Sequence, residues 1–351
     1  MGDRARRLGL RSAAYGRRRE LTGLDLVTGG AGFVGRALVA QLRARGRRVR
    51  VLDLKADGPD AIRGSVTDAD AVARAVDGAE GVYHLAGIAD LWRRSPADFD
   101  DINHQGTRYV LDAARRAGAR RFLLCSSATT LVAGSTPIGD STIDETVAHA
   151  PSALLGPYPA SKRRAELYAQ DAAAEGFNAV IVNPTEPIGA GDDAITPPTR
   201  MMLDFLNGAN PAYVDCLLNF APTVDLAEGM IAAMARGRSG ERYILAGEDI
   251  SLGNLLRLLT DLTGRPTPET KLPYAIALAV GGVETGLVAA LTGKPPRAPL
   301  TGVRLAGRRV VFSSGKAANE LGWRAGPLRL ALQEMLEWAA AKGLLAPAKG
   351  P

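Results

Sequence analysis

A tyrosine and a lysine that could exchange a proton stand four positions apart, as Tyr158 and Lys162. On a helix, side chains at this spacing project from the same face. The pKa of an isolated tyrosine is about 10, which makes it a poor base at neutral pH, but a neighbouring cation lowers that pKa. The pair therefore indicates acid–base chemistry, although many helices contain this spacing by chance.

Two serines, Ser126 and Ser127, follow the apolar residues 121–125. If that segment is a strand of a parallel sheet, the serines lie at its carboxyl edge, where ligands of open α/β folds bind. Ser127 could then hold a substrate oxygen beside Tyr158, with Thr129 as a further hydroxyl. The alternative is that these hydroxyls only cap backbone groups at the end of a strand.

Gly29, Gly32 and Gly35 follow the apolar segment 24–28 and open a helical pattern. Glycines at this spacing allow a tight turn, a close approach of the backbone to a pyrophosphate, and close packing of helix on strand. The pyrophosphate then lies at the helix N-terminus, where free N–H groups favour negative charge. The motif lacks the G-K-[ST] of a P-loop, so it predicts a dinucleotide site.

Asp53 lies about 20 residues beyond the glycines, at the end of the second predicted strand. A carboxylate there binds the adenosine ribose hydroxyls and repels a 2′-phosphate, so we expect NAD as the cofactor. NADP is not excluded, because Arg36 and Lys55 are near in sequence. Asp68 is placed either to contact the adenine or to cap the helix predicted over 69–77.

Short apolar strands alternate with helical segments through the first half of the chain. We predict strands at 24–28, 49–54, 81–85, 121–125 and 179–182. The helical segments between them are 33–42, 69–77, 98–117 and 158–175. This alternation favours an α/β fold, a Rossmann-type doubly wound parallel sheet with helices on both faces.

The regular alternation ends near Asn183. We predict a dinucleotide-binding domain over 23–185, to which residues 221–248 return. Residues 186–220 and 249–345 are expected to form a smaller, mainly helical C-terminal substrate lobe. Residues 1–22 are expected to be a basic, disordered tail.

The composition sets limits on function. The chain has 351 residues, of which 46% are hydrophobic and 23% charged, as in ordinary globular proteins. Two lone cysteines and three scattered histidines predict no disulfide framework and no metal site, so we expect a cytoplasmic protein. The net charge of +6 comes mostly from seven arginines in residues 1–20, so a nucleic-acid partner is not expected.

Residues 274–291 are apolar but are interrupted by glycines and Glu284. A membrane span needs about 20 predominantly apolar residues, so we expect a buried or interfacial helix that packs on the lobe rather than a span. For the chain as a whole, peripheral contact with a membrane and a homodimer are left open.

In combination, these motifs resemble the extended short-chain dehydrogenase/reductases, the NAD-dependent epimerase/dehydratase family. The order is T-G-G-A-G-F-V-G, an acid after the second strand, a serine pair, Y-x-x-x-K, and Asn183-Pro184 followed by Gly189. The likeness covers residues from about 24 to about 345. Several stretches, among them Leu91-Trp92 and 211–215, look most like the hopanoid-associated, dihydroflavonol-reductase-like subgroup that carries a sugar-epimerase label.

The resemblance implies roles for particular residues. It implies that Ser127, Tyr158 and Lys162 form the catalytic triad and that Asn103 helps to organise its proton relay. The cofactor residues that we expect on these grounds are Thr28, Gly29, Ala31, Gly32, Phe33, Val34, Gly35, Asp53, Val66, Asp68, Leu85, Ala86, Gly87, Ser126, Tyr158, Lys162 and Pro184. For the substrate we expect Ser127, Thr129, Glu186 and Arg200.

The resemblance also bears on the reaction. Members that act on nucleotide-sugars usually carry an arginine for the diphosphate where this chain has Leu218, and Arg200 is the replacement within 190–220. We therefore expect NAD(P)-dependent interconversion of a secondary alcohol and a ketone, on a small lipid-like or aromatic molecule. The alternatives are a nucleotide-sugar epimerase and a non-catalytic dinucleotide-sensing protein.

Overall fold

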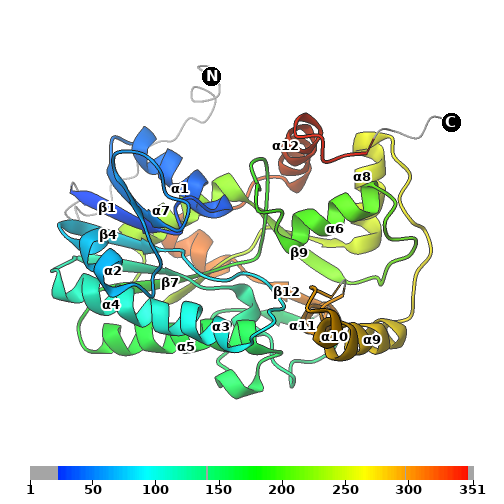
Figure 1. The fold of residues 1–351 in the computed structure, drawn as a ribbon, viewed down its shortest axis with the longest axis horizontal. Helices are drawn as coiled ribbons and strands as arrows, with labels where there is room; N and C mark the ends of the chain where they lie inside the picture. The colour runs from blue at the N-terminus through cyan, green and yellow to red at the C-terminus, as the bar shows by residue number, and fades with distance from the viewer. Residues whose placement is uncertain (1–22, 140, 297, 347–351) are drawn as a thin grey trace.

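A computed structural model describes residues 23–139, 141–296 and 298–346. Its centre is a parallel sheet of seven strands (Figure 1). From one edge to the other, the strands are β10 (Arg242–Leu245), β7 (Ala179–Pro184), β5 (Arg121–Cys125), β4 (Ala79–His84), β1 (Leu24–Thr28), β2 (Arg48–Asp53) and β3 (Ala61–Arg63). The predicted doubly wound α/β fold is confirmed. The predicted tail, 1–22, lies outside the described residues.

Helices cover both faces of this sheet, because consecutive strand residues point to opposite sides. Leu26 faces one layer and Val27 the other. The first layer contains α2 (Ala69–Val76), α4 (Gly106–Arg116) and α5 (Pro157–Ala174). The second contains α1 (Phe33–Ala44), α7 (Thr223–Arg236) and η5 (Ala317–Leu321). Since α7 and β10 come from 221–248, this late segment lies against the main sheet.

The chain between β4 and α4 passes through two short helical elements. These are α3 (Ala97–Phe99) and the π-helix η1 (Asp100–Gln105), and they run directly into α4. The single helix predicted over 98–117 is therefore interrupted by a wider turn. Such turns are frequent at functional sites.

A smaller lobe lies beyond the carboxyl ends of the strands. Besides helices it contains a three-stranded sheet, β11 (Glu248–Ser251), β9 (Leu217–Pro222) and β8 (Glu186–Ile188). The helices α6 (Pro197–Leu206), α8 (Leu252–Thr263) and α12 (Leu328–Ala341) pack on it through a third hydrophobic core. The strands are short, which explains why the sequence pattern indicated a mainly helical lobe.

Two further strands and two 3₁₀ turns complete the region around the sheet ends. The strands β6 (Ser141–Ile143) and β12 (Val310–Phe312) pair in parallel, and the turns are η2 (Ala128–Leu131) and η3 (Pro151–Ala153). The strand pair joins residues from the two predicted domains, with a small core of its own.

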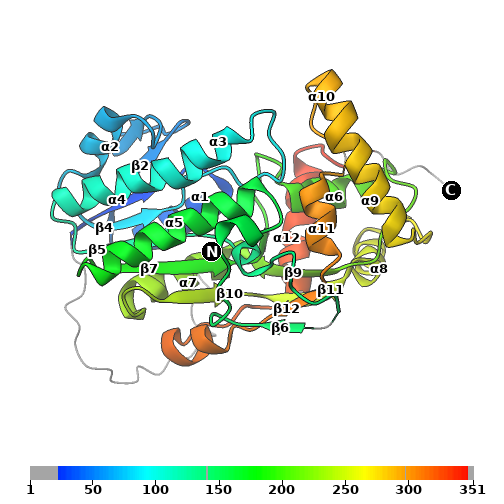
Figure 2. The same cartoon turned by 90° about the horizontal axis from the view of Figure 1, so that it is seen from below.

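A long apolar helix projects from the body of the molecule (Figure 2). It consists of α9 (Tyr274–Val283), η4 (Glu284–Val288) and α10 (Ala289–Thr292), and α11 (Leu300–Ala306) lies beside it. The 19-residue helix from Tyr274 to Thr292 is long and apolar enough to cross a membrane. Only 11% of its 18-residue apolar stretch is buried inside the protein. Of the two placements expected for this segment, the buried helix is therefore wrong, whereas the interfacial helix stays a prediction.

Candidate active site

The three glycines of the β1–α1 turn meet different demands. Gly29 has a left-handed φ of 71°, and a side chain at Gly35 would collide with the Gly29 carbonyl oxygen. Gly32 has an ordinary φ of −74°, and a Cβ there would approach only that same oxygen, at 3.2 Å. The fold itself therefore requires Gly29 and Gly35, whereas Gly32 leaves open space beside the helix.

The N-terminus of α1 fits an anion. The helix has 12 residues, no side chain caps it, and its first turn carries no acidic residue. The first N–H groups of a helix lack intrahelical partners, here those of Phe33, Val34 and Gly35. These donors and the helix dipole suit the pyrophosphate of a dinucleotide.

Asp53 ties the glycine turn to the end of β2. Its carboxylate accepts hydrogen bonds from the backbone N–H of Ala31 at 3.1 Å and of Lys55 at 2.9 Å. Arg36 does not contact Asp53 but forms an ion pair with Asp193 at 2.9 Å. The acid is therefore held beside the turn as the sequence predicts.

Two further residues expected at the cofactor, Asp68 and Val66, have structural partners. Asp68 caps α2, because its Oδ1 accepts from the N–H groups of Asp70 and Ala71 at 3.0 and 3.1 Å. The Val66 side chain is buried against Gly106 in the first core. For Asp68, the structure thus shows the helix-capping alternative.

A chain of hydrogen bonds links the cofactor turn to η1 through a buried histidine. Thr28 Oγ1 lies 2.7 Å from His84 Nδ1, and His84 Nε2 lies 3.0 Å from Thr107 Oγ1. Thr107 donates to the Asn103 carbonyl at 2.6 Å, so the Nε2 proton must point to Thr107. Burial lowers the pKa of His84 to about 3, so the ring is neutral.

The residues after β4 are fixed from both sides. The N–H groups of Leu85 and Ala86 donate to Thr28, the first to its carbonyl and the second to its hydroxyl. Gly87 faces the Asn103 amide and the Lys162 amine, and a Cβ there would lie 3.1 Å from Nζ. This loop therefore passes between the cofactor turn and the lysine.

Asn103 projects from the π-helix into the site. Its amide exchanges two hydrogen bonds with the backbone of Ile88, at 2.7 and 3.1 Å, and donates to Ser161 Oγ at 3.0 Å. Ser161 lies on α5 between the tyrosine and the lysine. Asn103 thus joins the loop after β4 to the catalytic helix.

Tyr158 and Ser127 meet directly. Tyr158 lies in the first turn of α5, is buried, and lies close enough to Ser127 for its hydroxyl group to interact with the Ser127 side chain. Ser127 Oγ also accepts from the Thr129 N–H at 3.2 Å and from the Thr129 hydroxyl at 2.9 Å. The strand-end serine and the helix tyrosine thus come together as the sequence predicts.

Electrostatics at Tyr158 differ from the expectation. Burial raises the pKa of Tyr158 to about 12, and the hydrogen bond from Ser127 only partly opposes this. The Lys162 amine donates instead to the Cys125 carbonyl at 3.1 Å, and burial lowers the pKa of Lys162. The expected lowering of the tyrosine pKa by the lysine is therefore wrong for this structure, in which Tyr158 is protonated at neutral pH.

A buried carboxylate that the sequence analysis missed organises the strand ends. Glu166 Oε1 lies 2.6 Å from Ser126 Oγ, 2.8 Å from Thr130 Oγ1 and 2.5 Å from Asn183 Nδ2. Its Oε2 pairs with Arg163 at 2.9 Å and with Arg242 at 3.6 Å. One signal was available, because Glu166 stands one turn after Lys162 on the same helix.

The substrate candidates are spread over the edge of the lobe. Pro184 ends β7, and Glu186 follows in β8. No described residue makes a hydrogen bond or an ion pair with the Glu186 carboxyl group in the structure, and burial raises its pKa to about 7. Arg200 lies exposed on α6 with its guanidinium 3.5 Å from the Ile195 carbonyl. Leu218 packs against the third core.

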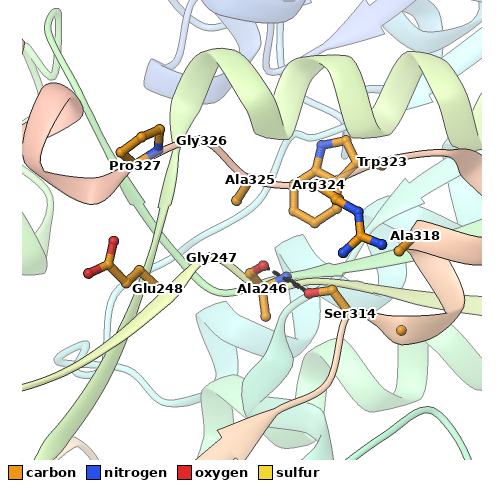
Figure 3. Close-up of a pocket in the computed structure, with 11 residues that line it drawn as sticks. Ala246, Gly247, Glu248, Ser314, Ala318, Trp323, Arg324, Ala325, Gly326 and Pro327 are labelled. Carbon is orange, nitrogen blue, oxygen red and sulfur yellow. Dashed lines mark hydrogen bonds between the residues drawn. The ribbon is translucent and has the colours of Figure 1, made fainter.

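A cavity of about 610 Å³ opens elsewhere, where β10 passes into β11 (Figure 3). Ser314 holds the backbone of Ala246 there, with hydrogen bonds of 3.1 and 2.8 Å. None of the predicted site residues lines it. Its lining residues are Ala246, Gly247, Glu248, Ser314, Gly315, Ala318, Trp323, Arg324, Ala325, Gly326 and Pro327.

The fold and these sites define a class of enzyme. The NAD dependent epimerase/dehydratase family matches residues 26–246. The chain therefore belongs to this family of extended short-chain dehydrogenase/reductases, and its cofactor is NAD(P).

Individual relatives share nearly the whole chain. "Putative dihydroflavonol 4-reductase" of Synechocystis sp. is 35% identical over 89% of this chain and 93% of its own length. Sterol demethylase protein B of Methylococcus capsulatus is 31% identical over 91% of this chain and 99% of its own length. The crystal structure of gox2253 superposes with a TM-score of 0.79 at 34% identity, covering 92% of this chain and 99% of that one.

Proposed function

We propose that this enzyme transfers hydride between NAD(P) and an uncharged, apolar molecule, interconverting a ketone and a secondary alcohol. NAD(P), when bound, supplies or accepts the hydride. The observation that carries the proposal is the placing of the buried Tyr158, in the first turn of α5, beside the buried Ser127 at the end of β5, with Lys162 one turn further along the same helix. Such a pair can hold a ketone oxygen and donate a proton to it as it becomes an alcohol.

The protein groups divide the work. Ser127 orients the reacting oxygen, and Tyr158 gives or takes its proton. Lys162 and Asn103 are joined to this pair through α5 and the loop at Gly87, where the cofactor ribose is expected. Asp53 beside the glycine turn favours NAD over NADP, because its charge opposes a 2′-phosphate.

The surroundings support an uncharged substrate. Leu218 stands on β9, packed with the lobe core, where a diphosphate would need a cation. Glu186 follows directly on the strand whose Asn183 donates to the Ser127 carbonyl at 3.1 Å. Burial raises the pKa of the Glu186 carboxyl group to about 7, and no described residue pairs with it. When this group is ionised, its negative charge would repel a neighbouring diphosphate. The names of the two relatives, a dihydroflavonol reductase and a sterol demethylase protein, also refer to uncharged ring systems.

One observation favours the second candidate, a nucleotide-sugar epimerase. Arg309 has an unusual left-handed φ of 49° and acts electrostatically on Asp215 and Cys216. Glu186 also acts on Cys216, so this arginine belongs to the same side of the lobe. Together with the exposed Arg200, it is a cation that a diphosphate would use if the enzyme were an epimerase.

One assay separates the two reactions. An epimerase reoxidises its own bound cofactor and gives no net change in nicotinamide absorbance, whereas a reductase consumes reduced cofactor in proportion to product. We expect net oxidation of NADH with flavanone-type or sterol-type ketones. Tyr158→Phe should lower turnover by roughly two to four orders of magnitude while cofactor binding survives. Interconversion of UDP-sugar epimers without a net change in cofactor, lost in Arg309→Gln, would overturn the proposal.

A further inference from the structure

The projecting helix Tyr274–Thr292, here termed the docking helix, presents its apolar side to the outside. On an ordinary surface helix the apolar stripe faces the core and the polar face meets water. Here apolar side chains face outward as well. Successive outward positions are spaced by three or four residues, so they form one stripe along the helix. Its members, with their exposed fractions, are Ile276 (47%), Val280 (47%), Val283 (55%), Leu287 (57%) and Leu291 (78%).

The opposite side of the docking helix holds it to the protein. Gly281 is buried, and a Cβ there would lie 3.2 Å from both the Ala298 carbonyl oxygen and Val303 Cγ2. Leu300 N donates to Thr285 Oγ1 at 2.9 Å. The helix is therefore attached along one side to the segment around α11 while its apolar stripe is left uncovered.

Charges near the stripe indicate what covers it. Glu284 is the one charged residue between positions 274 and 292. At the C-terminal end of the helix, the exposed Lys294 follows the last turn, and the Arg94 guanidinium packs beside Gly293. An apolar stripe with cations at its end matches a lipid surface, in which acyl chains lie below anionic headgroups.

We propose that the docking helix binds the surface of a bilayer that contains anionic phospholipids and lies in the plane of that surface. Its length and composition would also suit a span, but a span would require the contacts at Gly281 to break and would place Glu284 within hydrocarbon. Binding in the plane keeps the contacts with α11 and leaves Glu284 outside the hydrocarbon.

Docking would bring the catalytic end of α5 close to lipid. Thr301 of α11 fills the space beside Gly156, the residue that precedes α5 and its Tyr158. Leu91 lies beside Gly302 of α11 and also packs on the hydrophobic cluster around Tyr158. If the proposed function is correct, an apolar ketone dissolved in the membrane has a short path to the tyrosine. The docking itself does not depend on that function.

The test uses the full chain and flotation with lipid vesicles, without cofactor or substrate. One set of vesicles contains phosphatidylcholine alone and the other equal parts of phosphatidylcholine and phosphatidylglycerol. We expect the protein to float with the anionic vesicles and much less with the neutral ones. The double variant Val283→Asp, Leu287→Asp should bind at least about ten-fold more weakly, because both carboxylates would enter the interface.

Two control variants make the result decisive. Leu330→Asp, at an equally exposed apolar position on α12 (48%), should bind like the unmodified protein. Tyr158→Phe should also bind normally, so a failure of the catalytic proposal leaves this test intact. Flotation that survives in the double variant would assign binding to another part of the chain and overturn the proposal. Absence of flotation, resistance to an alkaline carbonate wash, or a dimer that the double variant converts to a monomer would each overturn it too.

Discussion

Replacing Glu166 by glutamine should damage this protein far more than the similar size of the two side chains suggests. The carboxylate is fully buried and meets donors on both oxygens. Oε1 faces Ser126 and Asn183, and Oε2 faces Arg163 and Arg242. A glutamine must turn its NH₂ group toward one of these sets, so donors would face donors there.

The charge adds to this cost. Arg163 and Arg242 are each about 6% exposed, and both form ion pairs with Glu166. Breaking a buried pair by neutralising one partner costs about 3–5 kcal/mol, since a charge is left buried without compensation. Typical domains are stable by about 5–15 kcal/mol, so this is a large share of the free energy of unfolding.

A matched control lies on the same helix. Glu175, at the C-terminus of α5, pairs with Arg115 at 2.6 Å, and both side chains are largely exposed. Exposed pairs contribute about 0–1 kcal/mol, so Glu175→Gln should change the unfolding free energy by no more than that. Urea unfolding, followed by circular dichroism, measures both variants.

Activity should respond as well. The Ser126 and Asn183 side chains hold the ends of β5 and β7, on which the Ser127 backbone depends. We expect kcat of Glu166→Gln to fall while the Kd for NAD stays near that of the unmodified enzyme, because the glycine turn lies on another strand. If Glu166→Gln loses less than about 1 kcal/mol, as for an exposed pair, the assignment of Glu166 as the central buried charge is refuted.

Four other substitutions test separate parts of the site. Gly32→Val should weaken NAD binding by roughly ten-fold or more with little change in stability, whereas Gly35→Ala should lower stability itself; calorimetry of both variants checks this. Asp53→Asn, which removes the charge but keeps an acceptor for the turn, should raise NADP affinity relative to NAD in fluorescence titrations. Burial raises the folded-state pKa of Glu186 to about 7, so stability should fall as pH rises from the unfolded pKa of about 4.3 through 7. Glu186→Gln should lack this fall in urea titrations across that range.

The main sheet could be predicted because its local and global signals agree. Each strand is a short apolar run, and residues such as Leu26 and Val27 supply one core on each face. The wider turn at Asp100–Gln105 could not be predicted, because periodicity does not distinguish it from an α-helix. The prediction that the helix Tyr274–Thr292 could be buried was wrong for a different reason, because apolar residues usually indicate burial.

The site was predictable where motifs are local and failed where it depends on tertiary contacts. Tyr158 and Ser127 meet as the spacing and the strand end suggest. Glu166 remained hidden because one of its partners, Arg242, lies far along the chain. The prediction that Lys162 lowers the pKa of Tyr158 was wrong, because burial, which raises this pKa, is the dominant influence.

The buried groups around the site share one electrostatic property, which supports the proposal of an uncharged substrate. Burial raises the pKa of Tyr158 and of Glu186 and lowers those of His84 and Lys162, so all four shift toward their uncharged forms. A region that disfavours charge on its own side chains also disfavours charge on a ligand that lacks a matching counter-ion. A nucleotide-sugar would therefore depend on cations such as Arg200 and Arg309 for its diphosphate, whereas an apolar ketone would need only the hydroxyl groups of Tyr158 and Ser127.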